Sequence, residues 1–290
     1  MKRFFTTTLV PAALLPAAFA LISCAPAKVL CPKDYQVDFQ EAQAFAQKAG
    51  LAYEADSAII KACGADSCFI LSGGVTGARA FVQRDDSARV QWIAFRGTQT
   101  LNDIQLDAEY SQARDTSLHM TFHRGFAAAT EDILPGILSH LDSGYRTLVT
   151  GHSLGGAMAA ITALQLDARG FKVKAVTFGQ PKVTNEAGAK RAAHLDLVRF
   201  IHGHDIVALV PPLDWRPGKD LGSYAHFGRE IALNEQGFEC LQEHFAKRYD
   251  PSSWWDQAQR QAVEDHAVAK YIARLGELAG VQASSTVPKP

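Results

Sequence analysis

A serine between two glycines, at the junction of an apolar run and an alanine-rich stretch, constrains this chain most. Gly151-His152-Ser153-Leu154-Gly155 follows the apolar segment 147–150 and precedes the segment 154–168. In a sharp strand-to-helix turn, a side chain at either glycine would collide with the neighbouring element, and the serine is pushed outward. A serine that only caps the helix is the alternative, but a cap does not explain the glycines. The pattern therefore predicts a nucleophilic Ser153 on a strand–turn–helix unit.

Strands and helices are expected to alternate along the rest of the chain. Apolar runs typical of strands occupy residues 79–82, 90–95, 173–178 and 197–201. Apolar residues at helical spacing occupy residues 39–61, 126–141 and 254–278. Such alternation favours an α/β fold with a largely parallel central sheet and helices on both faces. We expect a single domain over residues 37–280 and a flexible tail over residues 281–290.

Composition and charge exclude several classes of protein. Of the 290 residues, 47% are hydrophobic and 20% are charged, which excludes a disordered chain. Lys and Arg number 29 against 30 Asp and Glu, and there is no basic stripe to follow a phosphate backbone. We therefore expect no nucleic-acid partner.

The N-terminus has the pattern of an export signal. Lys2 and Arg3 precede an apolar run over residues 4–22, which two prolines interrupt and no basic stop follows. This indicates a signal peptide over residues 1–23 rather than a transmembrane helix. A cleavage site at small residues near Ala20 or Ala25 is the alternative to cleavage before Cys24.

The end of this apolar run resembles a bacterial lipobox. The residues that carry the resemblance are Leu21-Ile22-Ser23-Cys24. The resemblance implies a lipoprotein that has acyl chains such as palmitate on Cys24 and a tether over residues 24–36. Ala25 after the cysteine resembles the sorting pattern for the outer membrane of Gram-negative bacteria. We therefore expect a lipid-anchored protein of the bacterial cell envelope.

Four further cysteines are expected to form disulfides, because exported thiols tend to pair. They are Cys31, Cys63, Cys68 and Cys240. Sequence alone leaves three pairings open. Turn residues between Cys63 and Cys68 favour a local bridge, which would leave Cys31 with Cys240. A zinc site is disfavoured, because the single C-x4-C spacing has no matching second pair.

A serine nucleophile needs an imidazole base and a carboxylate that orients it. Where the serine stands on a strand–turn–helix unit of an α/β fold, the three residues follow along the chain in the order serine, acid, histidine. Only His226, His244 and His266 lie far enough beyond both Ser153 and a candidate acid to serve as the base. His152 is excluded, because its position in the turn directs its ring away from the serine hydroxyl.

Asp205 is the favoured acid. It follows the predicted strand 197–201, at the carboxyl end of a sheet strand, where ligands gather in α/β proteins. Asp196 precedes that strand and Asp214 follows a rigid Pro-Pro pair, so we expect both to be structural.

Several motifs, in order, resemble the class 3 lipase family, the fungal-lipase-like branch of the α/β-hydrolases. They are Phe95-Arg96-Gly97-Thr98, His123-Arg124-Gly125-Phe126, Gly151 to Ala157, Thr177 to Val183, Arg199 to Pro212, Tyr224 to Glu230 and Asp265-His266. The resemblance extends from about Phe39 to Leu278. It implies an α/β-hydrolase fold and the hydrolysis of acyl esters.

The resemblance also implies roles for individual residues. His266 becomes the base and His226 a structural histidine, and the backbones of Thr98 and Leu154 hold the oxyanion. Ester hydrolysis then proceeds through an acyl-Ser153 intermediate with no metal and no organic cofactor. We expect a monomer whose partners are its acyl-ester or lipid substrate and, through the anchor, a membrane.

The substrate class is left open by the sequence. Residues 98–122 occupy the place of the family's lid, where Leu101, Ile104 and Leu106 could face an acyl chain. The same segment is rich in polar residues, which is unusual for a lid that exposes an apolar face. A lipase or phospholipase, an esterase of non-lipid esters such as feruloyl-sugar linkages, and a non-catalytic binding lipoprotein are the hypotheses.

Overall fold

The computed structural model describes residues 35–98, 111–210, 223–241 and 263–286. Several predictions fall outside these ranges. They concern the signal peptide, most of the tether, Cys24, Cys31, Leu101, Ile104, Leu106, Asp214 and His244. These stay predictions.

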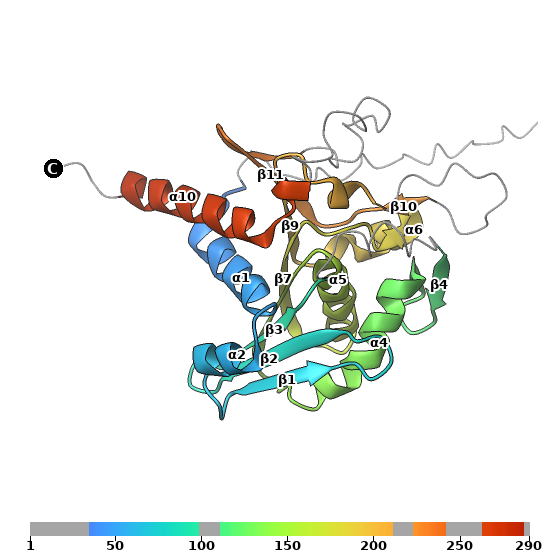
Figure 1. Ribbon diagram of the computed structural model, residues 1–290. Helices are drawn as coiled ribbons and strands as arrows, with labels where there is room; N and C mark the ends of the chain where they lie inside the picture. The colour runs from blue at the N-terminus through green and yellow to red at the C-terminus, as the bar shows by residue number, and fades with distance from the viewer. Residues whose placement is uncertain (1–34, 99–110, 211–222, 242–262, 287–290) are drawn as a thin grey trace, which may run out of the picture.

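A central sheet of eight strands forms the middle layer of the described residues (Figure 1). In spatial order the strands are β1 (Cys68–Ser72), β2 (Arg79–Asp85), β3 (Val90–Phe95), β6 (Arg146–His152), β7 (Lys172–Phe178), β9 (Leu197–His202), β11 (Arg229–Asn234) and β12 (Gly237–Cys240). The pairs from β3 through β6, β7 and β9 to β11 are parallel. The outer strands β1, β2 and β12 pair antiparallel. The expected largely parallel sheet is therefore confirmed, with antiparallel strands at both edges.

Helices cover both faces of this sheet, as expected. Helices α1 (Phe39–Leu51) and α10 (Val268–Thr286) pack on one face, and α4 (Arg124–Leu138) and α5 (Leu154–Asp167) on the other. Successive strand residues point to opposite faces. Leu148 accordingly joins the core beneath α1 and α10, while Val149 joins the core beneath α4 and α5.

Shorter elements complete the described residues. Helix α2 (Asp56–Cys63) precedes β1, and α6 (Glu186–Arg191) leads into the 3₁₀ turn η1 (Ala192–His194). A second 3₁₀ turn, η2 (Ile206–Leu209), follows β9. A small antiparallel sheet contains, in spatial order, β10 (Tyr224–Ala225), β8 (Thr184–Asn185), β5 (Met120–His123) and β4 (Gln112–Asp115). Half of the expected lid segment is therefore the β4–β5 hairpin, and residues 99–110 lie outside the described ranges.

Two expectations about helices need correction. The continuous helix over residues 39–61 is wrong, because the chain turns after α1, where the Tyr53 N–H donates to the carbonyl of Gly50 at 3.1 Å. The tail expected over residues 281–290 does not begin at residue 281, because α10 continues to Thr286, and residues 287–290 lie outside the described ranges. The Gln282 side chain accepts from the N–H of Phe39 and donates to the carbonyl of Val37, at 3.0 and 2.9 Å. These bonds fasten the end of α10 to the start of α1.

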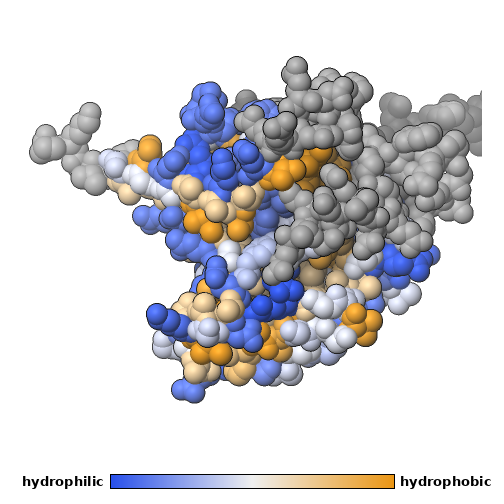
Figure 2. Space-filling view, in the orientation of Figure 1, coloured by the Kyte–Doolittle hydropathy of each residue, from blue (hydrophilic) through white to orange (hydrophobic). Residues whose placement is uncertain are grey.

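Figure 2 shows hydrophilic residues interspersed with smaller apolar patches over the face that carries α1, α2 and α10. The large apolar side chains of α1, such as Phe45, are instead buried against the sheet.

Within the described ranges, no helix combines the length and the apolar character needed to cross a bilayer.

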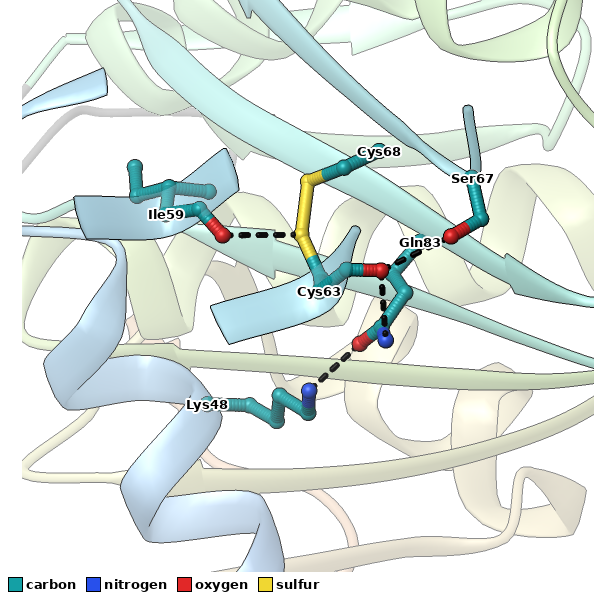
Figure 3. The surroundings of a disulfide bond; sticks show 6 residues. All are labelled: Lys48, Ile59, Cys63, Ser67, Cys68 and Gln83. Atoms are coloured by element: carbon teal, nitrogen blue, oxygen red, sulfur yellow. Dashed lines mark hydrogen bonds between the residues drawn. A yellow bond between two sulfur atoms is a disulfide. The ribbon is translucent and has the colours of Figure 1, made fainter. Parts of the chain in front are cut away.

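The predicted local disulfide is present. Cys63 at the end of α2 is bonded to Cys68 at the start of β1 (Figure 3). The carbonyl of Cys63 also accepts from Ser67 Oγ at 2.7 Å, while the Gln83 side chain bonds the Lys48 ammonium. The bridge thus joins α2 to the edge of the sheet. Cys240 is disulfide-bonded as well, and its pairing with Cys31 stays a prediction.

Candidate active site

Ser153 stands at a tight turn between β6 and α5. Its backbone has φ 61° and ψ −130°, a conformation that costs a non-glycine residue about 1–3 kcal/mol. A Cβ atom at Gly151 would strike the backbone of Gly155, and one at Gly155 would lie 2.5 Å from the carbonyl oxygen of Phe95. Glycine is therefore required at both positions for β6, α5 and the end of β3 to approach. The predicted strand–turn–helix unit is confirmed.

The Ser153 side chain does not cap the helix. Its Oγ makes no capping bond to α5 and has no hydrogen-bond partner among the described residues. The residue is 1% exposed, and its N–H donates to the carbonyl of Phe178 at 3.0 Å. The backbone is thus fixed while the hydroxyl is left available, which is what a nucleophile needs.

Asp205 and His266 form a buried acid–imidazole pair. Asp205 Oδ2 lies 2.8 Å from His266 Nδ1, and the carboxylate is fully buried. At Gly179, which has φ 55°, a Cβ would lie 2.5 Å from that carboxylate oxygen and 2.9 Å from His266 Nδ1. The missing side chain therefore leaves room for the pair at the end of β7.

Three donors hold the charge of the Asp205 carboxylate. Besides His266, the Tyr271 hydroxyl donates to Oδ2 at 2.5 Å and the N–H of Val207 donates to Oδ1 at 2.8 Å. Burial by itself raises the pKa of Asp205, but the charge of His266 and these hydrogen bonds outweigh it and hold the pKa below its ordinary value. Burial and the nearby carboxylate also raise the pKa of Tyr271, so its hydroxyl stays protonated and donating.

His266 keeps its other ring nitrogen unpaired. Its Nε2, like Ser153 Oγ, is buried with no hydrogen-bond partner among the described residues. The Ser153–His266 hydrogen bond is therefore not formed in this structure, although such bonds often close only when substrate binds. These two atoms are the ones that would exchange a proton during acyl transfer.

The alternative histidine has both ring nitrogens engaged. His226 Nδ1 lies 2.8 Å from the Arg199 guanidinium, which can only donate, so Nε2 carries the proton and donates to the carbonyl of Ala208 at 2.7 Å. This ring supports η2, the turn that Asp205 caps. Asp196 instead forms a half-exposed ion pair with Arg229.

Buried charged side chains support the loop that contains Asp205. Lys182 Nζ donates to the carbonyl of Leu209 at 2.7 Å, and burial together with nearby Arg199 lowers the pKa of Lys182 to about 8. The Arg199 guanidinium also bonds the Glu230 carboxylate and the carbonyl of Phe227. Arg199 on β9 thus bonds Glu230 on β11 and, through His226, the loop that presents Asp205.

The two expected oxyanion donors belong to segments that adjoin or contact Ser153. Leu154 is the first residue of α5, where backbone N–H groups lack intrahelical partners. Thr98 follows Gly97, and a Cβ at Gly97 would lie 3.1 Å from Ser153 Cβ. The described residues hold no group of three or more His, Cys, Asp or Glu side chains that could bind a metal.

Sequence reasoning missed several contacts that support the site. Tyr271 bonds Asp205, and Arg199 bonds Glu230, across more than 30 positions of sequence. No local pattern predicts these contacts, although Arg199 and Glu230 lie within the motifs named above. His152 was recognised as unsuited to be the base, but its contacts with Tyr53 and with the backbone of His266 were not foreseen.

Part of this chain is similar in sequence to known lipases. Residues 92–215 match the family model described as lipase (class 3). The chain is 28% identical over 171 residues to the secreted mono- and diacylglycerol lipase 1 of Fusarium solani, covering 52% of this chain and 51% of the relative. It is 27% identical over 177 residues to a lipase of Rhizomucor miehei, covering 56% and 47%. The chain thus spans about half the length of these curated relatives.

Solved structures share the fold. The triacylglyceride lipase of Rhizomucor miehei superposes with a TM-score of 0.62 at 20% identity, covering 80% of this chain and 92% of that one. Lipase II of Rhizopus niveus gives 0.61 at 22% identity, covering 79% and 92%. The fold is the α/β-hydrolase fold of these enzymes. The family model and the sequence relatives show in addition that part of this chain, including residues 92–215, is similar in sequence to class 3 lipases.

Proposed function

We propose that this protein is a serine hydrolase that cleaves acyl esters of lipids through an acyl-Ser153 intermediate. The observation that carries the proposal is that Ser153 Oγ and His266 Nε2 are both buried with no hydrogen-bond partner among the described residues, while the other nitrogen of His266 contacts the Asp205 carboxylate, which three donors hold ionised. The relatives and fold neighbours named as lipases support a lipid ester as the substrate.

In the proposed reaction, Ser153 Oγ attacks the ester carbonyl carbon while His266 Nε2 takes the hydroxyl proton. The backbone N–H groups of Leu154 and Thr98 hold the oxyanion that forms. The alcohol then leaves with the proton from His266. Water attacks the acyl-serine with His266 again as base, which releases the fatty acid and restores the serine. Asp205 orients the imidazole and stabilises its charged form throughout.

We also propose that the enzyme is held at the bacterial outer membrane by lipid on Cys24. The support is the sequence Leu21-Ile22-Ser23-Cys24-Ala25 at the end of the apolar run of the N-terminus. One acyl chain binds a membrane only marginally, while the several chains of a lipoprotein anchor it stably. The hydrolase body would then reach lipid in the surrounding bilayer.

Replacement of the nucleophile tests the proposed reaction. Ser153→Ala should lower kcat for p-nitrophenyl esters by about 10⁶-fold, because no acyl-enzyme can form. A series of acyl chain lengths, with a phospholipid and a feruloyl ester alongside, identifies the substrate class in the wild type. Full activity of the folded variant would overturn the assignment, and a preference for the feruloyl ester would replace the lipid by a non-lipid substrate.

The acid is tested by a matched pair of aspartates. Asp205→Asn should lower kcat by about 10³- to 10⁴-fold, because the amide presents the wrong partner to the His266 ring. Asp196→Asn is the control, since this carboxylate lies at the other end of β9 in an exposed ion pair. Equal activities of the two variants, with equal thermal midpoints, would show that Asp205 is not the acid.

The anchor is tested by fractionation. Cys24→Ser should move the enzyme from washed membranes to the soluble fraction, or leave the precursor unprocessed, because the thiol that receives lipid is gone. Intact-mass analysis of the wild type should show the added acyl groups. A processed and active variant that remains in the membrane fraction would place the anchor elsewhere.

A further inference from the structure

A second hydrogen bond holds His266 by its backbone, in addition to the bond between its ring and Asp205. His152, the residue before the nucleophile, has its Nε2 2.6 Å from the backbone carbonyl oxygen of His266. Its Nδ1 lies 2.9 Å from the Tyr53 hydroxyl. The two imidazole rings lie with their centroids 4.4 Å apart. His266 is thus hydrogen-bonded through its ring to Asp205 and through its backbone carbonyl to His152.

The chemistry of these partners fixes the direction of each bond. A carbonyl oxygen only accepts, so His152 Nε2 carries the proton and donates it to His266. In the neutral ring Nδ1 is then an acceptor, and the Tyr53 hydroxyl donates to it. Burial, together with the neighbouring His266 charge, lowers the pKa of His152 to about 3. The His152 ring therefore stays neutral at neutral pH.

The Tyr53 hydroxyl reaches a third segment of the site. This hydroxyl packs closely against the backbone of Gly97, where an added Cβ would strike it. Gly97 is the residue before Thr98, one of the proposed oxyanion donors. One tyrosine, on the turn between α1 and α2, therefore contacts the end of the oxyanion strand and, through His152, the base loop.

We propose that Tyr53 and His152 form a positioning relay, running from Gly97 through the Tyr53 hydroxyl and the His152 ring to the carbonyl of His266. The relay fixes the position of the turn that contains His266 relative to Ser153 and the oxyanion donors. His266 needs this second anchor because it lies in a turn just before α10 begins at Val268. The inference rests on the proposed function, in which His266 is the base.

Four variants of the full chain test the relay. Tyr53→Phe removes the donor to His152, and His152→Leu removes the donor to His266. His152→Gln keeps an N–H that can reach the carbonyl. Tyr145→Phe is the control, because it removes a tyrosine hydroxyl that bonds exposed Asp86 at 3.1 Å, near the opposite end of β6 from Ser153.

We expect Tyr53→Phe and His152→Leu each to lower kcat by about tenfold, the effect of losing one hydrogen bond, with KM unchanged. His152→Gln should recover most of the loss and Tyr145→Phe should match the wild type. In the His152→Leu background, Tyr53→Phe should add less than its effect alone, because it acts through the missing ring. The ¹⁵N spectrum of the wild type should show His152 as the neutral Nε2–H tautomer.

Distinct results would overturn the relay and the function beneath it. Wild-type kcat in Tyr53→Phe, multiplicative effects in the double variant, or a loss confined to thermal stability would reject the relay alone. Fluorophosphonate labelling of Ser153 provides the separate reading of function. A wild-type protein that neither hydrolyses esters nor takes the label would reject the proposed function instead.

Discussion

The close approach of three backbones around Ser153 is the constraint on which the rest of this molecule depends. The turn brings the end of β3, the end of β6 and the start of α5 within van der Waals contact, which is feasible only because Gly151 and Gly155 have no side chains. Ser153 is held at φ 61° by this packing and by its bond to Phe178. The strain costs about 1–3 kcal/mol, and the hydroxyl has no hydrogen-bond partner among the residues that the structure describes. The parallel sheet beneath, buried on both faces, provides the stability that offsets it.

A buried charge is the second demand on the fold. The Asp205 carboxylate has no exposed surface, and burial of an unpaired carboxylate would be prohibitive. The molecule meets this demand with direct donors from His266, Tyr271 and Val207. Behind them, Lys182 and His226 bond the carbonyls of the loop. The acid is therefore presented by a loop whose backbone is bonded on both of its sides.

The sequence predicted the features that are local or follow from alternation. The nucleophile turn is encoded within five residues, and the parallel sheet follows from strands separated by helices. Asp205 could be chosen because it comes directly after a strand. The helix end at Thr286 was missed, because composition suggested a loose tail and the bonds from Gln282 to Val37 and Phe39 span the length of the chain. The contacts of Tyr53 with His152 and of Tyr271 with Asp205 were missed for the same reason, since these partners lie far away in sequence.

The account stands on a covalent acyl group at Ser153, and trapping that intermediate tests it most directly. The protein would be mixed with a p-nitrophenyl ester, quenched in acid within the first turnover, and mapped by peptide mass spectrometry. The account predicts the mass of the acyl group on the peptide containing Ser153, with a burst of one p-nitrophenol per enzyme. Hydrolysis without a burst, or an acyl group on another residue while Ser153 stays unmodified, would contradict it.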